Sequence, residues 1–309
     1  MIGAVLAAAF FGVTPVVAGR AISLIGFVRA NLLRLSFAVV LMALWAFSFG
    51  QGLRGESLLF AAAGMIGFGI GGLSLLAALP RLGAPLASLI EESAAAPVAA
   101  AVAWVWYADS LTPGKIGFSA VILVGVVVGL LPYVRGTAIK GAKLGVALAL
   151  LAAVAQGVSF AMTRRGILLM QAAHTRPDTI TIAFQRLAGG FLVAVVVFVV
   201  ARWVWHRRWG FNGANGQCGP VIITSEGPIT SRPLFWGALN SLFGPILGVT
   251  CTVWAQQSLQ PGVVQAIAAT APLIAVPFAR WLQGHKPPAL FYLGAAISIA
   301  GLVLVNVVG

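Results

Sequence analysis

The sequence predicts an all-α integral membrane protein whose ten transmembrane helices are arranged as two inverted five-helix repeats. Of the 309 residues, 60% are hydrophobic and only 8% are charged, whereas about a quarter of a soluble domain is charged. The hydrophobic residues are gathered in segments of about 20 residues, the length that crosses the hydrocarbon core of a bilayer. Sequence patterns of the first half recur in the same order in the second half, which indicates an internal repeat.

Ten apolar segments have the required length, and their composition suits helices better than the alternating strands of a membrane barrel. We expect them at residues 2–18, 33–49, 58–79, 83–106, 116–132, 144–162, 180–201, 234–255, 262–282 and 289–307. The first repeat then occupies residues 1–132 and the second residues 144–309, with a polar, glycine-rich loop at 202–232.

Three pairs of stretches support the repeat. GVTPVVAGR (12–20) resembles GVSFAMTRR (157–165), RLSFAVVL (34–41) matches RLAGGFLV (186–193), and APVAAAVAWVWYADSLTP (96–113) aligns with APLIAVPFARWLQGHKPP (271–288). Because five is an odd number, the second copy must enter the membrane from the opposite side. Many secondary transporters share this plan, and their substrate site lies near the midplane between the repeats.

The short motifs in the chain do not indicate an enzyme. GFGIGG at 67–72 fits a dinucleotide fingerprint, but it lies in an apolar helix and not in a βαβ unit, so we interpret it as a close helix-packing step. The three histidines lack metal-ligand spacing, and no nucleophile elbow or Walker loop occurs. We therefore expect no enzymatic activity, no cofactor and no bound metal. The net charge of +13 indicates that the chain contacts lipid headgroups and not nucleic acid, because its lysines and arginines lie between apolar segments.

Glu91 and Glu92 are adjacent acids inside the predicted segment 83–106. At 1.5 Å per residue, Glu91 lies about 12 Å from the start of the segment. A charge at that depth costs on the order of 2.5–3.5 kcal/mol. Adjacent helical side chains point about 100° apart, so the two cannot face the same way. We predict that at least one faces a cavity and binds a substrate ammonium or carries a proton, which two neighbouring like charges would favour.

Two purely structural roles for these glutamates stay open at this point. An ion pair with Arg34 or Arg186 would lock helices together in the membrane. Alternatively, one glutamate could be protonated and hydrogen-bonded within the core. In either case the pair would have no part in transport.

Further polar residues lie at comparable depth and complete the predicted substrate site. They are Thr14, Gln156, Ser159, Asn240, Gln265 and Thr270. Hydrogen bonding between helices is the alternative role for each of them. In the repeat alignment Gln265 corresponds to Ile90, next to Glu91. Pro97 and Pro272 interrupt the fourth and ninth segments, and helices broken at matching places in two halves indicate a binding site. A simple packing kink at each proline is the alternative.

The chain also resembles the EamA-type branch of the drug/metabolite transporter superfamily. The similar stretches are GVTPVVAGR, the second helix that begins near Arg34, ALPRLGAPLASLIEESAAAP to DSLTPGKIGFSAVILVGVVVG, GPILGVTCTVWAQQSLQPGVVQAIAATAPL and HKPPALFYLGAAISIAGLVLV. The resemblance covers nearly the whole chain apart from 202–232. It implies ten helices in two repeats and transport of small metabolites, often amino acids, through a central cavity by alternating access.

We therefore expect a multi-pass secondary transporter of the inner cell membrane that exports small metabolites such as amino acids or amines, with proton coupling as an option. The alternative is a channel-like or lipid-translocating protein. The expected partners are the small-molecule substrate and membrane lipid, with the chain acting as a monomer or weak dimer. Orientation stays open, because the resemblance places 13 basic residues outside or near the outer side and 6 inside, against the positive-inside rule.

Overall fold

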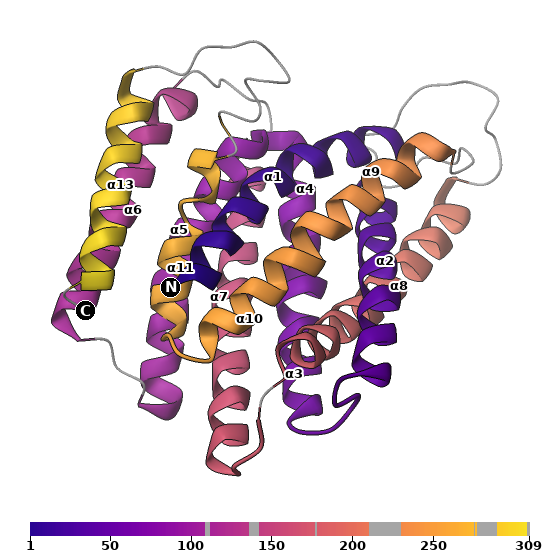
Figure 1. Cartoon of the computed structure of the whole chain (residues 1–309). Coiled ribbons are helices and arrows are strands. Elements are labelled where there is room, and N and C mark those ends of the chain that lie inside the picture. Colours follow the sequence, from indigo (N-terminus) through magenta and orange to yellow (C-terminus); the bar gives the residue numbers. More distant parts are fainter. Residues whose placement is uncertain are drawn as a thin grey trace.

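The computed structural model describes residues 1–108, 112–135, 142–176, 178–209, 230–274, 276 and 289–307, and these residues form helices joined by short loops. Figure 1 shows the helices packed side by side in a bundle. They are α1 (Ile2–Ile25), α2 (Phe27–Ser48), α3 (Ser57–Gly64), η1 (Met65–Gly71), α4 (Gly72–Leu82), α5 (Ala84–Tyr107), α6 (Pro113–Arg135), α7 (Ala142–Ala172), α8 (Thr179–Trp209), α9 (Ser231–Ser241), η2 (Leu242–Gly248), α10 (Val249–Gln256), α11 (Pro261–Ala268) and α13 (Ala289–Val307).

Seven helical stretches in the described part of the chain are long and apolar enough to cross a membrane. Three shorter apolar helices, Pro113–Gly129, Pro261–Ile274 and Ala289–Gly301, fall on the predicted segments that remain. The chain is therefore an all-helical, multi-pass membrane protein. The count of ten crossings stays a prediction, because only seven stretches of the described chain meet the criterion of length and apolarity.

The helix boundaries differ most from the prediction between the first two segments. The predicted segments end at 18 and begin again at 33, whereas α1 continues to Ile25 and α2 begins at Phe27. Gly26 alone joins them, with φ 78° and ψ 161°, and Gly83 joins α4 to α5 with φ 76° and ψ 159°. Glycine adopts such a positive φ without the steric cost that a Cβ brings. As a consequence, Arg34 lies two turns inside α2 and not at its end.

The third and eighth predicted segments each contain a π-helical stretch near the middle. These stretches are η1, with the sequence MIGFGIG, and η2, with the sequence LFGPILG. The sequence analysis predicts continuous helices here, and π-helical turns are rare and often occur at functional sites. The packing interpretation of the 67–72 glycines agrees with the structure, because Gly67 lies against Ser159 and Gly71 against Ala155, both on α7.

Helices from the two halves of the chain pack against each other in matched pairs. The second helix of each half makes one pair (α2 with α8), the last helix makes another (α6 with α13), and α5 packs on α7. The α6–α13 pair stands at the left of Figure 1. In the same view α1 ends, and α7 begins, at the upper end of the bundle, so these two helices run in opposite directions.

The closest backbone contact between the halves joins α3 to α8. A Cβ on Gly64 would overlap the backbone of Arg186, and a Cβ on Gly189 would overlap the backbone of Ala61. In lipid there is little hydrophobic drive for helices to associate, so such close backbone packing supplies much of the attraction.

Gly64→Ala is expected to lower the melting temperature of the purified protein in detergent. The added methyl group would force α3 away from α8, and overpacking of this kind typically costs about 1–3 kcal/mol. Gly117→Ala on α6 is the matched control, because no atom lies within 4 Å of its added Cβ. An unchanged melting temperature in Gly64→Ala would contradict the close contact.

Candidate functional site

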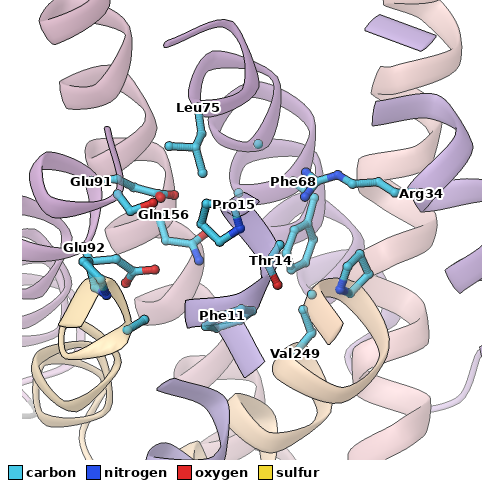
Figure 2. Close-up of a pocket in the computed structure, with 17 residues that line it drawn as sticks. Phe11, Thr14, Pro15, Arg34, Phe68, Leu75, Glu91, Glu92, Gln156 and Val249 are labelled. Carbon is cyan, nitrogen blue, oxygen red and sulfur yellow. The ribbon is translucent and has the colours of Figure 1, made fainter. Parts of the chain in front are cut away.

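A pocket with a cavity volume of about 70 Å³ lies between the helices of both halves. Residues of α1, α2, η1, α4 and α5 line it from the first half, and residues of α7, η2, α10 and the stretch after α11 line it from the second. This volume is below the range of about 300–1,000 Å³ that small-molecule sites occupy, so the pocket is narrow in this conformation. Its charged side chains are Arg34, Glu91 and Glu92, and Figure 2 shows how they lie.

Glu91 and Glu92 both line the pocket from α5, and their exposed fractions are only 6% and 7%. The Nε2 atom of Gln265 on α11 donates a hydrogen bond to Oε2 of Glu92. One turn earlier on α5, the buried Ser88 hydroxyl also lines the pocket and has no hydrogen-bond partner among the described residues. This side of the pocket therefore has several polar atoms that a ligand can satisfy.

The ion pair considered for these glutamates is not formed in the described part of the chain. No arginine or lysine nitrogen there lies within 4.0 Å of either carboxylate. Arg186 is fully buried and does not line the pocket. Its Nη2 atom donates to Oγ of Ser159 at 3.1 Å, and its guanidinium lies over the rings of Phe68 and Phe160, 5.1 and 5.6 Å from their centroids.

Arg34 enters the pocket from the side opposite the glutamates (Figure 2). Its Nε atom donates to Oδ1 of Asn31 at 3.0 Å, which fixes the plane of the guanidinium. A Cβ on Gly72 would stand 2.6 Å from Nη2 of Arg34. The missing side chain at Gly72 is thus what gives the guanidinium its room.

The predicted site residues fall into two groups. Thr14 and Gln156 line the pocket together with both glutamates, and Gln265 reaches it through its bond to Glu92. The remaining three do not line it. Ser159 accepts the bond from Arg186, Thr270 donates to the carbonyl of Ile267 at 2.8 Å, and Asn240 is fully buried.

The proline prediction holds for one half of the chain only. In the second half the helix is interrupted by a turn at Ala269–Thr270, immediately before Ala271 and Pro272, and these last two residues line the pocket. In the first half α5 runs without a break through Pro97. The prediction of matching breaks is therefore wrong, because a helix can retain a proline at the loss of one backbone hydrogen bond.

Sequence reasoning misses several residues of the pocket. It considers Arg34 only as an ion-pair partner, although an arginine within an apolar stretch is a usable signal. The apolar lining, which includes Phe11, Phe68, Leu75 and Val249, gives no signal in a chain where apolar residues are everywhere. These side chains add an apolar surface to a pocket that carries both signs of charge.

Comparison with known proteins places this architecture. The model of the EamA-like transporter family matches residues 1–131 and 143–307. The search of curated proteins gives no match. A solved structure described as "Crystal structure of protein" is similar over 100% of this chain and 98% of its own, with a TM-score of 0.73 and 14% sequence identity. At that identity the similarity shows a shared fold and carries no statement about activity.

Gln265→Leu is expected to destabilise the protein by about 1–3 kcal/mol, because it leaves the buried Glu92 carboxylate without its donor. The measurement is the melting temperature in detergent. Gln156→Leu removes an amide from the same pocket but keeps the bond to Glu92, so it serves as the control and should shift the temperature less. If the two variants melt alike, the bond between Gln265 and Glu92 does not stabilise the fold as stated.

Proposed function

The chain belongs to the EamA-like transporter family, and on that premise we propose that it is a secondary transporter that exports small amine-bearing metabolites by alternating access. The observation that carries the proposal is the pair Glu91 and Glu92, buried on α5 at the pocket surface with no basic side chain at ion-pair distance among the described residues. Ionisable residues inside membrane-spanning segments typically mark a substrate or ion pathway.

The chemistry of the pocket suits an ammonium group. An ammonium carries three hydrogen-bond donors and no acceptor, and Glu91 and Glu92 present carboxylate acceptors. Hydrogen bonds to charged groups contribute roughly 1.5–3 kcal/mol, which can offset part of the cost of burying the carboxylates. Thr14 and Gln156 offer further polar contacts across the same space (Figure 2).

Alternating access is supported by the places where the helices deviate from regular geometry. Lining residues come from η1, from η2 and from the stretch that follows the break after α11. Irregular helical backbone at membrane depth is tolerated where it lines a cavity, and it occurs at the substrate sites of many transporters. Because both halves of the chain line the pocket, a movement of one half against the other would change its access.

Transport of an amine by the reconstituted protein is expected to be saturable and to show counterflow. A thermal-stability screen of amino acids, amines, sugars and nucleotides first identifies a ligand, which stabilises by about 2.7 kcal/mol at a hundredfold excess over its Kd. Uptake of that ligand into liposomes is then measured. Flux without saturation or counterflow would contradict the carrier and favour the channel-like or lipid-translocating alternative.

Glu91→Gln and Glu92→Gln are each expected to weaken binding and transport of the amine by about tenfold or more, the equivalent of one charge-assisted hydrogen bond. Glu56→Gln is the matched control, because Glu56 precedes α3 and does not line the pocket. If both pocket variants transport the amine as the wild type does, neither glutamate belongs to the substrate site.

Proton coupling is the remaining part of the proposal. If Glu91 or Glu92 carries the proton, an imposed pH gradient should drive amine transport in the wild type and should drive it less in one of the two glutamine variants. The measurement is uptake as a function of the internal and external pH. A pH profile that is the same in wild type, Glu91→Gln and Glu92→Gln would exclude these glutamates as proton carriers.

A further inference from the structure

The pocket contains charges of both signs that are kept apart. Arg34 enters from α2, while Glu91 and Glu92 enter from α5 on the opposite side (Figure 2). Thr14 and Pro15 of α1 lie between them in this view. The charges do not approach within the ion-pair distance of 4.0 Å. Opposite charges attract each other across such a space, but the helices hold Arg34 and the glutamates short of an ion pair.

The position of Arg34 explains how the separation is maintained. Asn31 accepts the Nε hydrogen, and Gly72 provides the space in which the guanidinium lies. The exposed fraction of Arg34 is only 7%, and Figure 2 shows its nitrogen atoms directed toward the interior of the pocket. With Nε engaged, the two Nη groups stay available. Their planar arrangement matches the two oxygens of a carboxylate.

We propose that Arg34 binds the carboxylate of a zwitterionic substrate whose ammonium group is held by Glu91 or Glu92. This inference rests on the proposed function and narrows its substrates from amines in general to molecules that carry an ammonium and a carboxylate. Phe11, Phe68 and Leu75 line the same space, so the body of the substrate between and beyond the charged groups is apolar.

Arg186, the counterpart of Arg34 in the second repeat, shows what a structural arginine looks like in this fold. It is stacked between Phe68 and Phe160 and bonded to Ser159, and it does not line the pocket. Arg34 has no such aromatic cover in the described structure and makes its one hydrogen bond through Nε. An arginine is thus covered by aromatic rings in the second repeat and lines the pocket in the first.

The test compares matched probes on the purified full-length protein. Dissociation constants are measured for L-leucine and L-phenylalanine, for the amines 3-methylbutylamine and phenethylamine, and for 4-methylpentanoic and 3-phenylpropanoic acids, which keep the same apolar bodies. Each zwitterion should bind about tenfold or more tightly than its amine and its acid, as expected for one additional charge-assisted contact.

Arg34→Gln should abolish the preference for the zwitterion over the amine, because the variant loses the group that binds the carboxylate. Arg20→Gln is the control, because Arg20 is exposed on α1 and outside the pocket. If Arg34→Gln does not fold, Arg34→Lys keeps a charge without the planar fork and should cut the preference about threefold or more.

The outcomes separate this inference from the function on which it rests. Zwitterions that bind no tighter than amines to the wild type would overturn the inference and leave an amine transporter. A preference that survives unchanged in Arg34→Gln, or in Arg34→Lys where only that variant folds, would overturn the role of Arg34. Failure of zwitterions and amines alike to bind would overturn both.

Discussion

The cost of placing charge within a bilayer is the constraint on which the rest of this structure depends. Four charged side chains, Arg34, Arg186, Glu91 and Glu92, are buried inside the helices, and each costs on the order of 2.5–3.5 kcal/mol on insertion scales. Arg186 is bonded to a hydroxyl through Nη2 and lies over two aromatic rings, while its Nε and Nη1 atoms have no hydrogen-bond partner among the described residues. The remaining three have one described hydrogen bond each or none, and all three line the same pocket. Three of the four buried charges thus lie where a ligand or water can reach them.

The pocket exists because glycines, which have no side chain to fill the space, stand at its edges. Gly67, Gly72 and Gly244 line it from the irregular third and eighth spans, and Gly72 and Gly244 lie against Arg34 and Thr14. Elsewhere glycines bring helix backbones into contact, as Gly64 does on α8. The same residue type therefore produces tight packing between helices at one depth and free volume at another. A glycine that faces the backbone of another helix allows tight packing, and a glycine that faces a polar side chain leaves room for that side chain in the pocket.

Depth along a helix is readable from the sequence, but rotation about the helix axis is not. Counting 1.5 Å per residue places Glu91 well inside its predicted segment, and Glu91, Thr14 and Gln156 all line the pocket. Asn240 and Thr270 lie at similar depth yet face elsewhere, because a helix that is apolar on every side carries no periodic pattern that fixes its rotation. Arg34 escapes prediction for a different reason. The basic residues around it resemble the end of a membrane segment. In the structure Gly26 is the only residue between α1 and α2, so the chain is helical on both sides of it.

The two repeats share a plan, but they do not share the charges of the site. Arg34, Glu91 and Glu92 all belong to the first repeat, while the second supplies the amides of Gln156 and Gln265. Gln265 occupies almost the same place in the repeat as the glutamates, and it donates to one of them across the boundary. A second pair of acids there would add an insertion cost and like-charge repulsion without adding a new acceptor geometry. An amide instead stabilises the existing carboxylate, so divergence between the copies is what makes one charged site tolerable in lipid.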